Sequence, residues 1–188
     1  MGTEPWKGQE FSELVKEGPD YPAVYVSWDD AVAYCKKLSE KEGKTYRLPT
    51  EAQWEYACRA GTKTTWSFGN DKKTLGDYAW YESNALNSPE QHAHQVGLKK
   101  PNAWGLHDMH GNLFEWCHDY YGKDYYKQSP EKDPTGLAET TTGLRVLRGG
   151  SWYHGPGLAR SGFRMAERAA GFLLKYYPHG FRLVREVD

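Results

Sequence analysis

Two stretches of the chain combine a helical spacing of apolar residues with capping signals at both ends. Ser27 and Asp30 form a capping box, and Gly43 is a plausible stop for the helix between them. The apolar face of this helix is predicted at Trp28, Ala31, Val32, Cys35 and Leu38. Thr50 and Gln53 form a second capping box, for a helix over residues 51–60 that Gly61 ends and that turns Trp54, Ala57 and Cys58 inward.

The helical spacing fades after Gly61. Residues 62–145 are rich in Gly, Pro, Asn and Asp and predict loops with short strands. The stretch Arg145–Trp152 predicts a strand entering a tight Gly turn, and residues 180–185 predict a closing strand. No repeat of fixed period is visible, so residues 1–188 are expected to form one domain, with residues 1–22 as an entry segment.

Composition narrows the classes of function. The chain has 8 Trp, 14 Tyr, 6 Phe and 20 Gly, which favours large rings packed around an irregular backbone. Its net charge of −1 argues against a nucleic-acid or membrane-surface partner, which would require a basic excess. No apolar run approaches the roughly 20 residues of a membrane span. The first nine residues lack the pattern of a signal peptide, so localisation stays open between the cytoplasm and display on a virion or cell surface.

The cysteines indicate packing rather than cross-linking. There are three, Cys35, Cys58 and Cys117, an odd number with no close spacing. A disulfide framework and a CxxC metal knuckle are therefore disfavoured, and reduced, buried thiols are expected.

Six segments, in order, resemble the formylglycine-generating-enzyme (sulfatase-modifying factor) family. They are Val26–Ala31, Tyr46–Gly61, Asn102–Leu106, Gly111–Trp116, Arg145–Trp152 and Gly180–Leu183. The resemblance implies an α+β, C-type-lectin-like fold with two helices, a small twisted antiparallel sheet and long irregular loops. The family usually opens with a strand-rich segment, of which little remains here.

The same resemblance implies that the family's oxidation chemistry is missing. The family enzyme converts a substrate cysteine to formylglycine with copper held by two cysteines that follow a Gly-Gly-Ser-aromatic motif. The first of these positions is His154, the second falls within residues 158–160, and residues 118–188 contain no Cys. Only Met165 offers a soft ligand for copper(I) there. We therefore expect no copper and no catalytic residues. The alternative is a divergent oxidoreductase or accessory domain acting on a peptide or natural product.

The resemblance also implies a structural Ca²⁺ site. Its oxygen ligands map to Asp108, Gly111, Leu113 and Glu115. The alternative is that Glu115 forms a salt bridge or cap within the fold. Asn84 is a weaker candidate for a second site. His92 and His94 are expected in a surface loop, and Glu51 and Glu55 as helix caps or on solvated helix faces.

Residues 152–180 carry the sharpest functional hypothesis. This segment is similar to the variable region of diversity-generating-retroelement variable proteins, in which Asn codons are converted to codons for Tyr, His, Ser, Gly, Leu or Phe. Rigid aromatic rings and adaptable small residues are the chemistry of a paratope. The implied function is non-catalytic recognition of a protein or other macromolecular ligand by a monomer. The predicted ligand contacts are Tyr153, His154, Gly155, Leu158, Ser161, Phe163, Met165, Glu167, Tyr176, Tyr177 and His179.

The alternative for this segment is that its rings belong to the core. Phe163, Leu173 and Leu174 are evenly balanced between core and surface. Exposure is expected for the residues with polar tips that lie near turn formers, which are Tyr153, His154, Tyr176, Tyr177 and His179. Arg164 and Arg168 are expected to belong to the frame.

Overall fold

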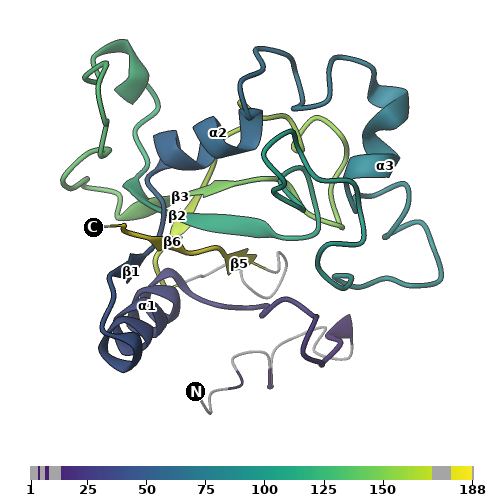
Figure 1. The fold of residues 1–188 in the computed structure, drawn as a ribbon, viewed down its shortest axis with the longest axis horizontal. Helices are drawn as coiled ribbons and strands as arrows, with labels where there is room; N and C mark the ends of the chain where they lie inside the picture. The colour runs from purple at the N-terminus through teal and green to yellow at the C-terminus, as the bar shows by residue number, and fades with distance from the viewer. Residues whose placement is uncertain (1–3, 5–6, 9–13, 171–178, 188) are drawn as a thin grey trace.

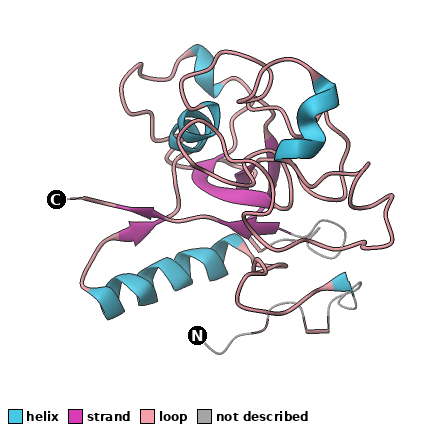
Figure 2. Cartoon of the chain, turned by 45° about the vertical axis from the view of Figure 1, so that its right-hand side comes forward, coloured by secondary structure: helices cyan, strands magenta, loops and turns pink. Residues whose placement is uncertain are grey.

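The structure, a computed structural model, describes residues 4, 7–8, 14–170 and 179–187 (Figure 1). Its helices are α1 (Trp28–Glu42), α2 (Glu51–Arg59) and the short α3 (Leu75–Tyr78), with 3₁₀ turns η2 (Lys72–Thr74) and η3 (Tyr125–Lys127). Its strands are β1 (Tyr46–Arg47), β2 (Phe114–Tyr120), β3 (Leu144–Arg148), β4 (Met165–Arg168), β5 (His179–Phe181) and β6 (Val184–Arg185). The predicted α+β fold is confirmed, and Figure 2 shows how much of it is loop. Within the described ranges, no helix is both long and apolar enough to cross a membrane.

Both main helices begin where the capping signals place them. The side chains of Ser27 and Thr50 each accept a hydrogen bond from the backbone N–H three residues on. The side chains of Asp30 and Gln53 accept in turn from the backbone N–H groups of Ser27 and Thr50. Gly43 ends α1 in the left-handed conformation, as expected. Ala60, with φ of 47°, takes that role after α2 in place of Gly61, so this predicted boundary was one residue late.

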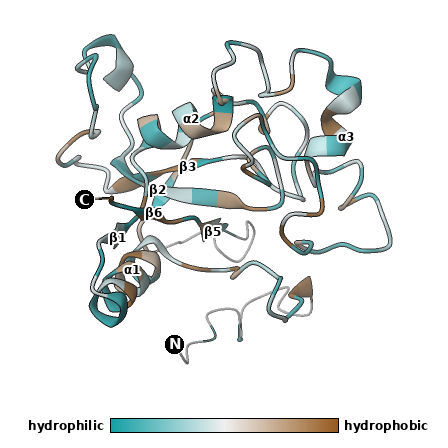
Figure 3. Cartoon of the chain, in the orientation of Figure 1, coloured by the Kyte–Doolittle hydropathy of each residue, from teal (hydrophilic) through white to brown (hydrophobic). Residues whose placement is uncertain are grey.

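Hydropathy colouring shows apolar patches among hydrophilic ones along α1 (Figure 3). Ala31 and Cys35 are buried there, beside the half-buried Trp28. Val32 is 36% exposed, so its predicted place on the apolar face was wrong. Position 32 lies at the edge of the stripe, where a helix of 3.6 residues per turn carries it out of contact.

A four-stranded sheet in the order β4-β3-β2-β5 forms the centre of the fold. Strand β2 pairs antiparallel with β3 and parallel with β5, so the predicted small antiparallel sheet contains one parallel pair. The predicted closing strand divides, because β5 joins this sheet while β6 pairs with β1 in a second, two-stranded sheet. Helix α2 lies on one side of the central sheet, and α1 lies near β1 and β6 (Figure 1).

Large rings and thiols fill the space between these elements. Trp54, Phe114 and Trp116 are each at most 1% exposed. All three cysteines are buried and free, which confirms the expectation of reduced thiols. Burial raises the pKa of the Cys58 thiol to about 12, so it is protonated and weakly nucleophilic at neutral pH.

Candidate functional site

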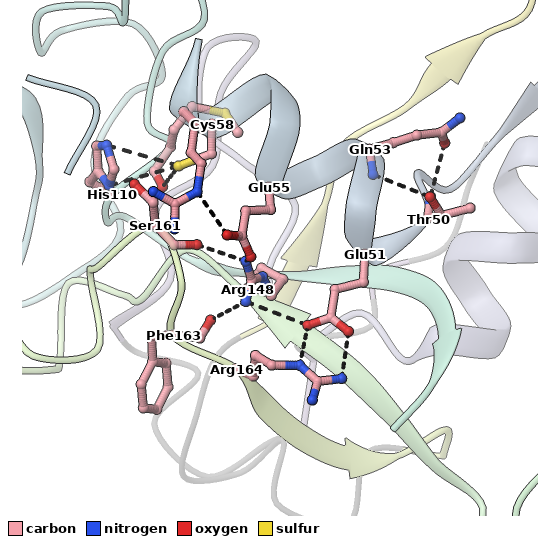
Figure 4. A network of polar contacts seen from close by, with 12 residues as sticks. Thr50, Glu51, Gln53, Glu55, Cys58, His110, Arg148, Ser161, Phe163 and Arg164 are labelled. Atoms are coloured by element: carbon pink, nitrogen blue, oxygen red, sulfur yellow. Dashed lines mark hydrogen bonds and ion pairs between the residues drawn. The ribbon is translucent and has the colours of Figure 1, made fainter. Parts of the chain in front are cut away.

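A buried arginine on the central sheet holds the backbone of the segment expected to bind ligand. Arg148, at the end of β3, is 0% exposed. Its guanidinium donates to the carbonyl oxygens of Ser161 and Phe163, both at 2.7 Å. It also pairs with the Glu55 carboxylate from α2, and Figure 4 shows these contacts converging from three parts of the chain. Neither anchored carbonyl belongs to a side chain, so this attachment does not depend on which side chains the segment carries.

A second arginine extends this network. Arg164 donates to both Glu51 oxygens, at 2.6 and 2.7 Å, which is the fork geometry of a strong Arg–carboxylate pair. Glu51 is only 1% exposed and also lies 3.4 Å from Arg148. The expected solvated position of Glu51 was therefore wrong, because its N-terminal place on α2 points into the protein. The expected frame role of Arg164 is confirmed, whereas Arg168 is exposed.

His110 provides another backbone anchor. Its Nδ1 lies 2.8 Å from the Ala159 carbonyl oxygen, and its Nε2 accepts from the Ser67 backbone N–H at 3.0 Å. Burial lowers the pKa of His110 to about 4, so the ring is neutral at pH 7. Because Nδ1 faces a carbonyl oxygen, which can only accept, the ring proton lies on Nδ1. Two backbone hydrogen bonds also hold the segment: Ser161 N–H donates to the Thr65 carbonyl oxygen, and Glu82 N–H donates to the His154 carbonyl oxygen.

Among the predicted ligand contacts that the structure describes, Tyr153 is the most exposed. Its ring is 43% exposed and rests edge-on against buried Trp152, with ring centroids 5.5 Å apart. The predicted exposure of Tyr153 is confirmed. Leu158, Phe163 and Met165 are half-buried and pack against the core that contains Phe114 and Trp116, so each offers one face at most to a ligand.

His154 is half-buried and lies between the core and the surface. Its Nδ1 is 2.6 Å from the Ser151 hydroxyl, and its ring contacts Phe114 edge-on. Burial lowers the pKa of His154 to about 4, which leaves it neutral and a weak base at pH 7. Gly155, the next residue, is half-buried beside the carboxylate of Glu82.

Three predicted ligand contacts are inside the protein. Ser161 is 0% exposed, Glu167 is 4% exposed and His179 is 0% exposed. The exposure predicted for His179 was wrong, because β5 carries its ring into edge-on contact with Trp116. Among the described residues neither of its ring nitrogens has a hydrogen-bond partner, and burial lowers its pKa to about 3. Tyr176, Tyr177, Leu173 and Leu174 lie outside the described residues.

The four residues expected to bind calcium line one cavity of about 620 Å³. Asp108 is 8% exposed; its Oδ2 accepts from Gly97 N–H at 2.9 Å, and its Oδ1 has no partner among the described residues. Burial raises the pKa of Asp108, as expected for a carboxylate without a cation. An unpartnered carboxylate oxygen beside the Gly111 and Leu113 backbone fits a hard cation.

Glu115, the fourth expected calcium ligand, has other partners. It accepts from Trp54 Nε1 at 2.7 Å and forms an ion pair with Arg182 from the segment after β5. The ion pair with Arg182 agrees with the alternative prediction for Glu115, a salt bridge within the fold in place of a calcium ligand. No cluster of three or more His, Cys, Asp or Glu side chains suited to a metal occurs in the part of the chain that the structure describes. Asn84 is also engaged, since its amide bonds the backbone at Tyr81 and Ala79.

His92 and His94 were expected in a surface loop, and this was wrong. They are 9% and 5% exposed, and His94 stacks on Trp80 with ring centroids 3.8 Å apart. Sequence reasoning also missed Glu82, Gly157, Arg160 and Gly162, which lie on or beside the exposed side of the anchored segment. The only signal for this region in the sequence is its high glycine content between residues 149 and 162. That content does not distinguish glycines needed for turns from glycines on the surface.

The chain is similar to known proteins in sequence and in structure. Residues 2–187 match the sulfatase-modifying factor enzyme 1-like domain. The formylglycine-generating enzyme of Streptomyces coelicolor is 37% identical over 142 residues, which cover 71% of this chain and 43% of the enzyme. The inactive C-alpha-formylglycine-generating enzyme 2 of Bos taurus is 33% identical over 144 residues, 73% of this chain and 40% of that protein. The solved structure of Treponema denticola variable protein 1 superimposes with a TM-score of 0.81 at 31% identity, covering 97% of this chain and 77% of that one. The chain thus spans less than half the length of these two curated relatives.

Proposed function

This chain belongs to the family of sulfatase-modifying factor enzyme 1-like domains, and from that premise we propose that it is a non-catalytic binding protein. It recognises a macromolecular ligand through the exposed side of residues 152–170, on a C-type-lectin-like frame. One observation carries the proposal: Tyr153 is exposed between Trp152 and His154, whose backbone groups bond Asn112 and Glu82, and buried Arg148 and His110 fix the carbonyls at 159, 161 and 163 further along the same segment. A rigid backbone that presents an aromatic ring has little entropy to lose on binding.

The thiols of the chain support a non-catalytic role. Copper(I) and covalent thiol chemistry both use the thiolate. Burial raises the pKa of Cys35, Cys58 and Cys117, so each is protonated at neutral pH. The segment after the Gly-Gly-Ser turn, where the resemblance places the catalytic cysteines, contains none.

The similarity to a variable protein supports the mode of recognition. The superposition covers 97% of this chain. We therefore propose that residues 152–170 belong to the ligand-specific part of a diversity-generating-retroelement variable protein, acting as a monomer.

The proposal is tested by replacing one ring. Wild type and Tyr153→Ala are immobilised and exposed to extracts of the producing cells and of cells from the same habitat, and captured proteins are identified by mass spectrometry. Each captured protein is then purified and titrated against both variants. Loss of a hot-spot tyrosine costs about 2 kcal/mol, so Kd should rise roughly 30-fold.

Tyr34→Ala is the matched control, because Tyr34 is 37% exposed on α1. It should bind like wild type, and all three proteins should be equally folded by circular dichroism. Equal Kd values for wild type and Tyr153→Ala would contradict the proposal.

A second candidate is a divergent oxidoreductase or accessory domain acting on a peptide or natural product. It is favoured by the 2.6 Å contact between Ser151 and His154, at the position where the resemblance places a catalytic cysteine. This candidate predicts a transition metal bound near His154 and lost in His154→Ala. Metal analysis of the two purified proteins tests it.

A further inference from the structure

The cavity that contains Asp108 is separate from the proposed ligand-binding segment. Its volume is about 620 Å³, and its walls come from the chain before α1, the start of α1, the loops around residues 96–97 and 107–115, and residues 180–183. No residue between 152 and 170, all of which the structure describes, lines it. Pockets for small organic ligands have volumes of about 300–1,000 Å³, so this cavity has the size of a small-molecule site.

Apolar side chains form much of the cavity wall. Val26 and Leu113 are at most 5% exposed, and Phe181 and Leu183 are half-buried and pack against the same core as Val26. A Ca²⁺ ion alone would leave these walls unused, because calcium binds roughly six to eight oxygen ligands. A ligand that fills the cavity therefore needs an apolar body.

Several polar groups of the wall are already satisfied within the protein. The Asn112 amide accepts from the His94 backbone N–H and donates to the His94 carbonyl oxygen. The Arg182 guanidinium donates to both Glu115 oxygens and to the His107 carbonyl oxygen. The only guanidinium in the described part of the wall is thus committed to an internal ion pair and is not free to bind an anion.

The charged groups that remain in the wall are two carboxylates. Asp108 is 8% exposed; its Oδ2 accepts from the Gly97 backbone N–H, and its Oδ1 has no hydrogen-bond partner among the described residues. Asp30 is exposed on the first turn of α1, and its carboxylate accepts from the backbone and hydroxyl of Ser27. The hydrogen bonds of both carboxylates come from neutral groups, so the cavity is electrostatically complementary to a cation.

His107 adds a neutral acceptor to this wall. Its Nδ1 lies 2.8 Å from the Lys99 carbonyl oxygen, which can only accept, so Nδ1 carries a proton and Nε2 of the neutral ring is an acceptor. The Lys99 ammonium is engaged elsewhere, since it donates to the Gly76 carbonyl oxygen at 2.7 Å and lies over the Trp80 ring. A ligand of this cavity must therefore supply hydrogen-bond donors.

We propose that this cavity is a binding site for a small primary amine with an apolar or aromatic body. The ammonium group, which has only donors, bonds the Asp108 carboxylate, and the charge of Asp30 adds to the attraction. The body of the amine lies against Val26, Phe181 and Leu183. The site goes beyond the proposed function, because it contains no residue of the segment 152–170. A divalent cation at Asp108 would compete with the amine, so amine binding is measured with EDTA present.

The ligand class is tested by amide chemical-shift titration of the isotope-labelled protein with phenethylamine. The amides of Gly97, Gly111 and Gly180, which line the cavity, should shift with a Kd of about 1 mM or lower. 2-Phenylethanol lacks the charge and methylamine lacks the ring, so each should bind at least about tenfold more weakly. Unshifted glycine amides at about 10 mM phenethylamine, or equal binding of 2-phenylethanol, would overturn the proposal. Tighter binding of Nα-acetyl-lysinamide, which carries the ammonium of a peptide lysine, would overturn the assignment to a small molecule.

Variants test the location of the site. Asp108→Asn keeps an acceptor for the Gly97 N–H and should raise the Kd of phenethylamine at least about tenfold, whereas Asp30→Asn should raise it about two- to fivefold. Asp29→Asn is the matched control, because Asp29 is exposed on the same helical turn and does not line the cavity, so its Kd should equal that of wild type. Equal Kd values for wild type and Asp108→Asn would overturn the proposal, and the ligand series decides it if this variant does not fold. The proposed function fails separately, through unchanged binding of captured proteins by Tyr153→Ala.

Discussion

Replacing Arg148 with Met is the most direct perturbation of the anchored segment. Methionine keeps much of the volume and removes the buried charge. Three kinds of contact are lost: the ion pairs to Glu55 and Glu51, the bond to the Ser161 carbonyl and the bond to the Phe163 carbonyl. Arg164 still neutralises Glu51, and Arg59, at 2.7 Å, still pairs with Glu55. The uncompensated groups are therefore mainly the two carbonyls.

The expected cost follows from these contacts. Removing one partner of a buried ion pair costs about 3–5 kcal/mol, and each buried acceptor left without a donor costs about 1–3 kcal/mol. Because the two glutamates keep other partners, we count only the two carbonyl acceptors, which together cost about 2–6 kcal/mol, and take about 4 kcal/mol as the expected loss. For a domain of this length, that corresponds to a fall of roughly 8–16 °C in the thermal midpoint.

The assay is unfolding in urea and by heat, followed by tryptophan fluorescence, with amide hydrogen exchange as a local readout. The matched control is Arg160→Met, because Arg160 is exposed and should change stability by less than about 0.5 kcal/mol. Exchange of amides over residues 159–165 should accelerate in Arg148→Met at urea concentrations where the rest of the protein is folded. A loss below about 1 kcal/mol, with unchanged local exchange, would refute the idea that Arg148 holds this backbone.

Three further outcomes are expected. First, the free energy of unfolding should fall as pH decreases below about 6.5. In the folded protein, burial lowers the pKa values of His110, His154 and His179 to about 4, 4 and 3. In the unfolded chain these histidines bind protons already near pH 6.5, so acid favours the unfolded state. Each histidine contributes a slope of up to about 1.4 kcal/mol per pH unit. Asp119 partly offsets this slope, because burial raises its pKa to about 6. A urea midpoint that is equal at pH 5 and pH 7.5, or an unchanged pH slope in His110→Gln, would contradict the prediction. Calcium at 100 times its Kd should stabilise the wild type by about 2.7 kcal/mol and leave Asp108→Asn unaffected, and a midpoint insensitive to calcium would count against the ion. Finally, Ellman's reagent should react with all three thiols only after unfolding, because burial keeps them protonated; one rapidly reacting thiol in the native protein would contradict the burial of Cys35, Cys58 and Cys117.

Local signals were sufficient for the two main helices. A capping box is a pattern of four residues, and its hydrogen bonds depend on little outside those residues, so Ser27 and Thr50 mark helix starts in the sequence as they do in the structure. The thiols were also predictable, because an odd number of distant cysteines leaves burial as their simplest state.

Burial of polar side chains could not be predicted in the same way. Glu51 was expected in solvent because glutamate at a helix N-terminus usually caps or faces water, but its burial depends on Arg148 and Arg164, about 100 residues away in the chain. His179 was expected in solvent because it follows Pro178, yet pairing of β5 with β2 turns it inward. Such outcomes depend on strand pairing over long separations, which residue spacing does not encode.

A frame that holds a segment by its carbonyl oxygens can change the side chains of that segment without changing how it folds. Arg148 and His110 recognise groups that every residue possesses, so substitutions at exposed positions above them leave the bonds intact. The acids that pair with Arg148, Glu51 and Glu55, lie on α2 and not on the segment itself, so this ion-pair network does not depend on the side chains of the segment. It follows that exchanging a cysteine for His154 removes a reactive group but no anchor, which is how one fold can support both oxidation and recognition.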